Sequence, residues 1–331
     1  MHNNSVAVIG SGSWATALVK ILLNNLDNVN WWIREPEIIN HLLKFKHNPQ
    51  YLSSVKFDIT RLELSNNITT TINNSQIIVF CIPAVFLNET IKKLSADLLK
   101  NKVIISAIKG IVPDHQMIVG DYFRSKFGLG FDQVSIVTGP SHAEEVAYEK
   151  LTYLTVASTD NSRAKEIADL FNCRYIKTSL SNDILGMEYA PVLKNIIAIA
   201  SGICNGLGYG DNFQAVLISN AIKEIKIFLD KVSPLSRDVN DTAYLGDLLV
   251  TCYSQFSRNR TFGNMIGKGY SVKFAKYEMK MVAEGYYAVK SIYHMNLGHK
   301  LKMPITEAVY NILYEGALAK TEIKKLSEKL R

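Results

Sequence analysis

Cysteine is scarce in this chain, with four residues among 331. The cysteines stand singly in apolar surroundings, without the CxxC or Cys/His spacing of a metal site. This spacing excludes a disulfide framework and gives no support for a metal. We therefore expect no bound metal, and reduced core thiols at Cys81, Cys173, Cys204 and Cys252.

The sequence also lacks an unbroken apolar stretch long enough to span a bilayer. Its N-terminus runs into an apolar strand without the basic region, long apolar core and cleavage site of a secretion signal. We therefore expect a cytoplasmic protein with no membrane span.

Concentrated charge of one sign is absent as well. Lys and Arg outnumber Asp and Glu by 37 to 30, and the net charge of +7 suits anionic ligands as well as nucleic acid. The densest basic segment, residues 320–331, alternates with glutamates and leucines, which is typical of a solvated terminal helix. We expect no nucleic-acid partner.

What the sequence does contain is a change of pattern between its two halves. With 47% hydrophobic residues, the chain is long enough for two cores. Short apolar runs typical of buried parallel strands occur at 6–9, 29–33, 76–82, 103–107, 134–138 and 153–157. Helical patterns lie between them at 14–23, 37–46 and 84–99, and then dominate at 186–205, 212–229, 286–296 and 304–313.

This order predicts an α/β fold with a Rossmann-type, doubly wound, mostly parallel sheet followed by an all-helical domain. Ser, Asn and Asp gather at 179–183, so we place the boundary there. Residues 1–181 would form a dinucleotide-binding domain, and residues 182–331 a helical substrate-binding domain.

The segment VAVIGSGSWATAL at 6–18 joins a strand to a glycine turn and an apolar helix. Gly10 permits the tight turn, Gly12 lets the backbone approach a pyrophosphate, and Ala15 allows close packing of helix on strand. A turn that merely links strand to helix is the alternative. The strand before and the helix after favour dinucleotide binding.

Two further loops follow strands. Lys109 stands where strand ends usually meet ligand, unless it is an exposed surface lysine. In GPSHAEE at 139–145, Ser141 and Glu144 have the spacing of a helix capping box, while Gly139 before a helix start also suits an anion.

Lys194 lies on a helical stripe of otherwise small or apolar residues. It either snorkels out of the core or is desolvated with a lowered pKa, as an amine that carries protons near neutrality requires. We favour the second interpretation. Asn195 could bind a ligand or face water, and Pro191 predicts that the helix begins or kinks there.

Three segments further along carry charged groups. Asp247 stands at the start of an apolar helix, where N-terminal capping is the simpler role. The donor-rich SRNR at 257–260 suits phosphate oxygens, with a salt-bridged loop as the alternative. Glu284 before a glycine could meet a ribose or end a helix.

Cofactor preference stays open at the end of the second strand. Arg34 suits the 2′-phosphate of NADP, and Glu35 suits the ribose diol of NAD.

Seven collinear segments resemble NAD(P)-dependent glycerol-3-phosphate dehydrogenase of the bacterial type: GSGSWATAL at 10–18, IKGI at 108–111, GPSHAEEV at 139–146, LKN at 193–195, GLGYGDN at 206–212, GD at 246–247 and SRNR at 257–260. The resemblance implies hydride transfer between C2 of sn-glycerol 3-phosphate and NAD or NADP, giving dihydroxyacetone phosphate, with Lys194 as proton acceptor. In cells the reductive direction would supply phospholipid synthesis.

The resemblance also implies the contact residues. Substrate contacts would come from Lys109, Gly139, Ser141, Lys194, Asp247, Ser257, Arg258 and Asn259. Besides Gly10 and Gly12, cofactor contacts would come from Ser13, Trp14, Arg34, Lys109, Ala143, Arg258, Val282 and Glu284.

Two alternatives remain at this point. A β-hydroxyacid dehydrogenase also joins a Rossmann domain to a helical domain and uses a lysine, but it binds a carboxylate, whereas SRN at 257–259 with Lys109 favours phosphate. A nucleotide-sensing protein without turnover is the other. We expect a homodimer, because the helical half offers more apolar surface than one monomer easily hides.

Overall fold

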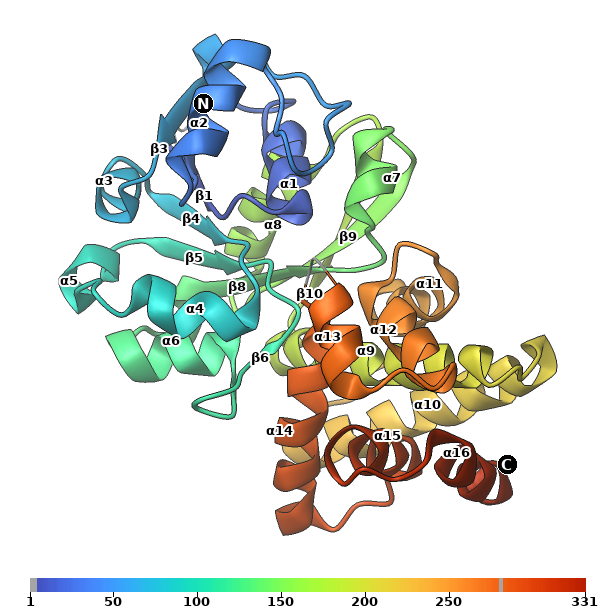
Figure 1. Cartoon of the computed structure of the whole chain (residues 1–331). Helices are drawn as coiled ribbons and strands as arrows, with labels where there is room; N and C mark the ends of the chain where they lie inside the picture. The colour runs from blue at the N-terminus through green and yellow to red at the C-terminus, as the bar shows by residue number, and fades with distance from the viewer. Residues whose placement is uncertain (1–4, 280–281) are drawn as a thin grey trace. The chain divides into compact units, whose positions relative to one another are not determined.

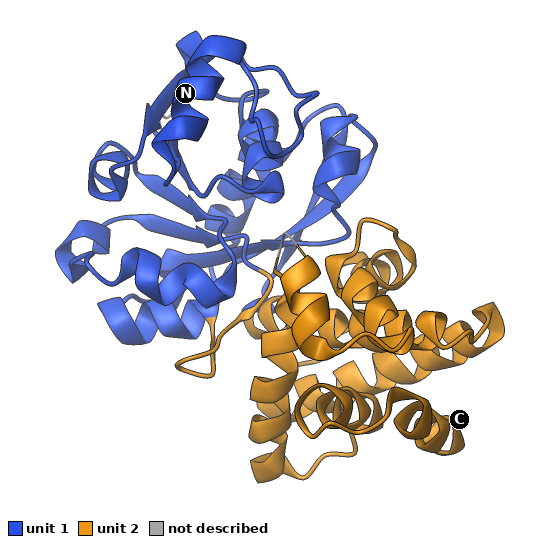
Figure 2. Cartoon of the chain, viewed as in Figure 1, with its two compact units in different colours: residues 1–108, 119–184 blue, residues 109–118, 185–331 orange. Residues whose placement is uncertain are grey.

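The structure, a computed structural model, describes residues 5–279 and 282–331. The chain divides into two compact units, shown in Figure 2. Unit 1 comprises residues 1–108 and 119–184, and unit 2 comprises residues 109–118 and 185–331. Residues 109–118 therefore belong to the helical unit, although the sequence on both sides of them belongs to unit 1.

Unit 1 contains an eight-stranded sheet with the order β10-β9-β8-β5-β4-β1-β2-β3. Neighbouring strands from β3 to β8 are parallel, β8 and β9 are antiparallel, and β9 and β10 are parallel. The predicted mostly parallel α/β fold is thus confirmed. The strands are Val6–Ile9 (β1), Val29–Trp32 (β2), Leu62–Ser65 (β3), Ile77–Phe80 (β4), Val103–Ser106 (β5), Val134–Thr138 (β8), Thr152–Ala157 (β9) and Ile176–Ser181 (β10).

The two strands at the edges of the sheet, β3 and β10, were not predicted. Each presents partly exposed positions, so neither has the continuous apolar run by which buried strands are recognised.

Helices connect the strands of unit 1 (Figure 1). They are Ser13–Leu22 (α1), Pro36–Phe45 (α2), Ile68–Asn73 (α3), Ala84–Ile91 (α4), Ala96–Leu99 (α5), Val119–Phe127 (α6), Ala143–Ala147 (α7) and Asn161–Phe171 (α8). The single helix predicted over 84–99 is wrong. A turn closed by the Leu94 N–H on the Ile91 carbonyl separates α4 from α5.

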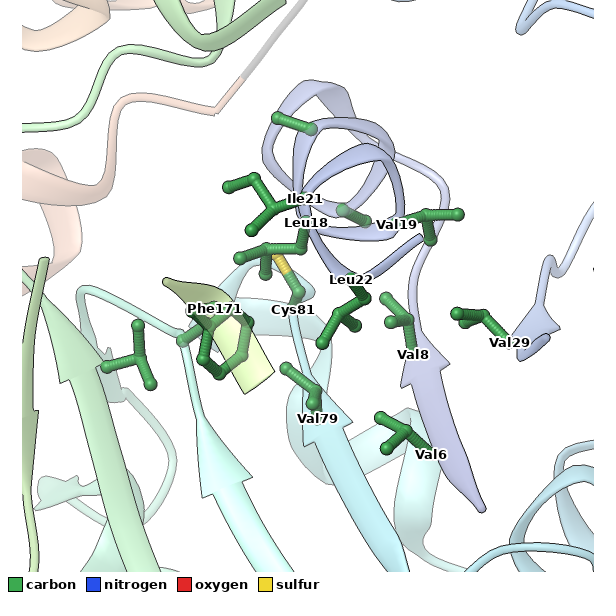
Figure 3. Packing of buried hydrophobic residues seen from close by; sticks show 14 of the residues in the cluster. Val6, Val8, Leu18, Val19, Ile21, Leu22, Val29, Val79, Cys81 and Phe171 are labelled. Atoms are coloured by element: carbon green, nitrogen blue, oxygen red, sulfur yellow. The ribbon is translucent and has the colours of Figure 1, made fainter. Parts of the chain in front are cut away.

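The core of unit 1 fixes α1 on the sheet. Figure 3 shows Leu18 and Leu22 of α1 with Val6 and Val8 of β1 and Val79 of β4. All five are at most 1% exposed. Burying each such side chain is worth about 1.5–3 kcal/mol, so the orientation of α1, and hence of the glycine turn before it, is strongly determined.

Unit 2 is helical apart from the hairpin of β6 (Ile111–Val112) and β7 (Met117–Ile118). Its helices are Ile184–Gly206 (α9, in this unit from residue 185), Asp211–Val232 (α10), Asp247–Tyr253 (α11), Arg258–Gly267 (α12), Val272–Glu278 (α13), Glu284–His299 (α14), Pro304–Tyr314 (α15) and Ala319–Lys329 (α16).

Helix α9 is the central element of unit 2. It begins at Ile184 and continues through Pro191, so the prediction that the helix begins at the proline is wrong. By length and composition α9 could cross a membrane, but 94% of its apolar window is buried inside the structure, as in a core helix.

Glycines let α9 and α12 pack backbone to backbone. A Cβ on Gly202 would lie 2.0 Å from the Arg260 carbonyl oxygen, and one on Gly263 would lie 2.1 Å from that of Ile199. Real Cβ atoms essentially never come so close, so no larger residue fits at this contact. The positions of the groups on these two helices are therefore coupled.

Candidate active site

The glycine turn lies outside the carboxyl ends of β1 and β4, where the strand order of the sheet reverses. Open α/β sheets bind ligands at such a switch point. Gly10 has a φ of +133°, and a Cβ there would lie 2.2 Å from the Cys81 carbonyl oxygen. At Gly12, which precedes α1, a Cβ would meet nothing within 4 Å, so the space before the helix is open.

Two residues that the sequence did not reveal hold this turn. Asn48 is fully buried and donates to the Ser11 carbonyl (2.9 Å) and to Thr16 Oγ1 (3.0 Å). The Trp31 indole N–H donates to the Gly10 carbonyl at 2.7 Å. Asn48 lies 37 residues from Ser11, so no local pattern could have indicated this role.

Trp14, the second residue of α1, follows this turn directly. Its Nε1 is buried, and the described residues offer it no hydrogen-bond partner. A buried N–H without a partner is costly, and a ligand oxygen would satisfy it. With the open space at Gly12 and the helix N-terminus behind it, the turn fits the pyrophosphate of a dinucleotide.

At the end of β2, Arg34 and Glu35 form an ion pair (Nη2 to Oε1, 2.6 Å). Glu35 also accepts a hydrogen bond from the Ser11 hydroxyl at 3.1 Å. The acid therefore lies beside the glycine turn, while the Arg34 side chain is 69% exposed.

The loop after β8 differs from its prediction. Helix α7 begins at Ala143, and His142 stands before it without a side-chain cap. The capping box of Ser141 and Glu144 is thus wrong, because the Ser141 hydroxyl turns back to the Gly139 carbonyl (3.0 Å). Gly139 has a φ of +117°, and a Cβ there would lie 2.7 Å from the Tyr153 carbonyl, so its backbone conformation requires glycine.

In unit 2, Lys194 is 5% exposed and its amino group is held by two residues of α11. Nζ donates to the Asp247 carboxylate and, at 2.9 Å, to Thr251 Oγ1. The Thr251 hydroxyl donates its own proton to the Asp247 carbonyl (2.6 Å), so its oxygen is left to accept from Lys194. Two of the three N–H positions of the amine are therefore used in hydrogen bonds to Asp247 and Thr251. The third position carries a proton when the amine is charged and a lone pair when it is neutral.

The environment of Lys194 brings its pKa close to neutrality. Burial has the largest effect and lowers the pKa, the charge of Lys109 also lowers it, and Asp247 raises it; together they bring the pKa from 10.5 to about 7. The interpretation of Lys194 as a desolvated amine is thus supported by its burial. An amine with a pKa near 7 can both take and give a proton at the operating pH.

Asp247 is not the helix cap that the sequence favoured. A π-helical turn, Thr242–Gly246, runs into α11, and the carboxylate, 1% exposed, lies between two lysines. Its second oxygen faces Lys109 Nζ at 3.4 Å. Thr251 was missed, although its spacing of four residues from Asp247 on one helix is a signal that could have found it.

Lys109 is part of the same cluster, since its segment belongs to unit 2. The Asn195 side chain donates to the Lys109 carbonyl at 2.9 Å, so it neither faces water nor is wholly available to a ligand. Asn195 therefore ties the 109–118 segment to α9 beside Lys194.

The predicted phosphate-binding segment forms the start of α12. Ser257 is the N-cap, accepting from the Arg260 N–H at 3.3 Å, and Arg258 is the first helical residue. The segment is therefore the start of a helix, and the alternative prediction of a loop is wrong. Since the N-terminus of a helix attracts anions, Arg258 and the first amides of α12 suit a phosphate.

Asn259 links α12 to α14. Its side-chain oxygen accepts from the Gly285 N–H at 2.9 Å. A Cβ on Gly285 would lie 2.5 Å from the Asn195 carbonyl, so α14 begins against α9. Glu284 thus starts a helix rather than ending one, and Val282 is half-buried just before it.

The structure brings together Lys109, Lys194, Asn195, Asp247 and Thr251 in unit 2. It places Gly10, Gly12, Ser13, Trp14, Arg34, Gly139, Ser141 and Ala143 in unit 1. Among the described ranges, no group of three or more His, Cys, Asp or Glu side chains could hold a metal.

A strand order that reverses at a glycine turn is the arrangement by which parallel sheets bind dinucleotides. An amine that titrates near neutrality is what proton transfer alongside hydride transfer requires. Together they define the class of the protein as a dinucleotide-dependent oxidoreductase.

Comparison with known proteins narrows this class. The family models for the N-terminus and C-terminus of NAD-dependent glycerol-3-phosphate dehydrogenase match residues 5–164 and 183–324. The chain is 33% identical to glycerol-3-phosphate dehydrogenase [NAD(P)+] of Bacillus subtilis, covering 97% of this chain and 93% of that one. It is 36% identical to the protein of that name from Agathobacter rectalis, covering 97% and 95%.

A crystal structure of glycerol-3-phosphate dehydrogenase from Coxiella burnetii is similar to 98% of this chain and 99% of its own, with 27% identity and a TM-score of 0.91. The chain therefore belongs to the NAD-dependent glycerol-3-phosphate dehydrogenase family. This confirms the resemblance seen in the sequence, and with it an oxidoreductase that uses NAD or NADP.

Proposed function

We propose that this protein interconverts sn-glycerol 3-phosphate and dihydroxyacetone phosphate, with Lys194 as the acid-base residue. The observation that carries the role of Lys194 is its buried amine, held by Asp247 and Thr251 and with a pKa lowered to about 7. Family membership supports the substrate, because the relatives in Bacillus subtilis and Agathobacter rectalis are named for it.

The bound nicotinamide supplies a hydride acceptor in one direction and a hydride donor in the other. In the oxidative direction, neutral Lys194 takes the proton of the C2 hydroxyl while C2 loses its hydride, leaving a carbonyl. In the reductive direction the ammonium form returns the proton to the oxygen. Asp247 and Thr251 fix the amine so that only its third direction exchanges a proton with substrate.

The substrate phosphate would bind at the start of α12, to Arg258 and the amides around Asn259, and near Lys109. Remote binding of this kind orients the reacting carbon, and its energy contributes to catalysis. Gly139 and Ser141 complete the proposed substrate contacts. Ser13, Trp14 and Ala143 of unit 1, with Val282 and Glu284 of unit 2, complete those to the cofactor.

We further propose residues 1–181 and 182–331 as the functional domains, a cytoplasmic homodimer without a membrane span, and a supply of glycerol 3-phosphate to phospholipid synthesis. The burial of α9 supports the absence of a span. Sedimentation of the purified protein tests the dimer.

The deciding experiment follows oxidation of NADH and NADPH on addition of dihydroxyacetone phosphate. Turnover is expected with at least one cofactor, and dihydroxyacetone without phosphate is the control for the role of the phosphate. Turnover of a 3-hydroxy acid with none of glycerol 3-phosphate would instead indicate a β-hydroxyacid dehydrogenase. Binding of both ligands without turnover would indicate a nucleotide sensor.

A further inference from the structure

The end of β2 presents both an arginine and an acid, and their contacts distinguish the two roles that the sequence left open. Arg34 Nε and Nη2 both lie on Glu35 Oε1, at 2.8 and 2.6 Å. Glu35 Oε2 accepts from the Ser11 hydroxyl at 3.1 Å. The guanidinium is thus engaged by the acid, and the acid is held against the glycine turn.

The position of Glu35 is determined by the backbone as well. Pro36 is the first residue of α2, and a residue before proline is restricted to extended conformations. Glu35 accordingly has φ −90° and ψ 112°. Ser11 is itself fixed, because Asn48 holds its carbonyl at 2.9 Å. The carboxylate therefore spans the gap between the first turn and the second strand.

In Rossmann folds, an acid about 20 residues beyond the glycine turn hydrogen-bonds the 2′-hydroxyl of the adenosine ribose. We propose that Glu35 makes this enzyme selective for NAD(H), by binding the ribose diol and excluding the 2′-phosphate of NADP(H). Arg34 then acts as a positioning residue for Glu35 rather than as the receptor of the phosphate. This inference rests on the proposed function only for its kinetic readout.

Electrostatics favour the diol over the phosphate at this place. A 2′-phosphate placed against Glu35 would be repelled by the carboxylate, and the charge of the neighbouring Arg34 is already offset by that carboxylate. A diol, in contrast, has two O–H donors for an acceptor-only group. Arg34 could bind the 2′-phosphate only if its guanidinium left Glu35.

The test measures binding and turnover separately. The three tryptophans, Trp14, Trp31 and Trp32, all lie in unit 1, so titration of their fluorescence with NADH and with NADPH reports affinity without substrate. We expect the wild type to bind NADH at least about tenfold more tightly, as the loss of a charge-assisted hydrogen bond implies. The ratio of kcat/KM for NADH to kcat/KM for NADPH should show the same preference.

Glu35→Gln keeps an acceptor but removes the charge, so it should raise affinity for NADPH about tenfold and change that for NADH much less. Arg34→Ala should lower affinity for NADPH no more than that for NADH. Glu37→Gln, which removes an exposed charge from the first turn of the same helix, is the matched control and should leave the ratio unchanged.

A wild type that prefers NADPH, or a Glu35→Gln ratio equal to that of the wild type, overturns the inference. If the fluorescence titrations show the expected preference but no variant turns over dihydroxyacetone phosphate, the proposed function fails and the selectivity of Glu35 stands. If dihydroxyacetone phosphate is turned over but Glu35→Gln leaves the ratio of NADH to NADPH affinity unchanged, the selectivity of Glu35 fails and the proposed function stands.

Discussion

The two units form their candidate ligand contacts by different means. In unit 1 the contacts depend on backbone: a glycine turn, the start of α1 and the space that a missing Cβ leaves at Gly12. In unit 2 they depend on charged side chains, with Lys194 buried against Asp247 and Thr251. Backbone suits a pyrophosphate that needs only holding, whereas acid-base chemistry needs a side chain that changes its charge.

The two units also differ in whether the residues that stabilise the site are the same ones that carry out its chemistry. Asn48 and Trp31 hold the glycine turn by neutral hydrogen bonds. Lys194 is instead held by the same Asp247 that raises its pKa, so support and chemistry in unit 2 cannot be separated. Substitutions in the two units should therefore fail in different ways.

The largest expected effect is that of Lys194→Met. It removes the proton carrier while filling the same volume, so kcat should fall by about 10³-fold, with the affinity for NADH unchanged within about twofold. In the wild type, oxidation should rise with pH through about 7, because the base must be neutral, and reduction should fall there. Initial rates of oxidation and of reduction, measured across this pH range, give these profiles.

The exposed Lys223→Met on α10 controls for the loss of a lysine and should keep full rate. Full activity of Lys194→Met with both ligands bound would show that the acid-base role is wrong. Loss of NADH binding in Lys194→Met would show that the two units are not functionally separable.

The contrast between the units explains what the sequence could predict. The glycine turn is a contiguous motif, and Lys194 is anomalous on its own helix, so both were predicted. Asp247 lies 53 residues from Lys194, and its local position is typical of a helix cap, so its pairing required the fold. Asn48 is similar, since its contacts with Ser11 and Thr16 form only when the loop after α2 folds back.

Gly263→Ala tests whether close helix packing supports unit 2. The added Cβ would lie 2.1 Å from a backbone oxygen of α9, which cannot move as a side chain could. Overpacking in cores costs about 1–3 kcal/mol, and this backbone contact places Gly263 at the upper end. Urea unfolding should show the loss, accompanied by a fall in kcat as α9 shifts against α12.

Gly298→Ala is the matched control, because a Cβ there meets nothing within 4 Å and its helix, α14, is exposed at that point. Alanine should stabilise the helix by roughly 0.5–1 kcal/mol. Equal stability of the two variants would contradict the packing argument.

Asn48→Ala is the corresponding test of unit 1. It leaves the Ser11 carbonyl, Thr16 and the amides of Gln50 and Tyr51 without their shared partner. A buried group left unsatisfied costs about 1–3 kcal/mol, so stability should fall and NADH should bind several-fold more weakly. The kcat at saturating ligands should change little, in contrast to Lys194→Met.

Asn24→Ala provides the comparison at the opposite end of α1, where the side chain is exposed and caps the last turn. It should leave the affinity for NADH unchanged. An Asn48→Ala variant that binds NADH as tightly as Asn24→Ala would show that the turn needs no support from Asn48.

The smallest effect on activity is expected for Glu224 of unit 2, a buried carboxylate away from the chemistry. It accepts from the amides of Ile305 and Thr306, each at 2.9 Å, and from the Thr306 hydroxyl at 2.6 Å. Burial raises its pKa from 4.5 to about 7, although these donors lower it. The folded protein therefore holds a proton that the unfolded chain releases between pH 4.5 and 7. Its stabilising contribution is full below 4.5 and is lost as the pH rises through 7, with a slope of at most about 1.4 kcal/mol per pH unit.

Glu224→Gln, which cannot titrate, should flatten this part of the stability curve, as urea unfolding across the window would show. Glu328→Gln removes an exposed carboxylate from α16, a charge that does not act on Glu224, and should leave the slope in place. Lys194 has the opposite effect on stability above pH 7. Its pKa is about 7 in the folded protein and 10.5 in the unfolded chain, so between these pH values the unfolded chain binds a proton that the folded protein has released. Stability should thus rise with pH in that range, and the rise should disappear in Lys194→Met. Persistence of the fall below pH 7 in Glu224→Gln would assign it to other groups.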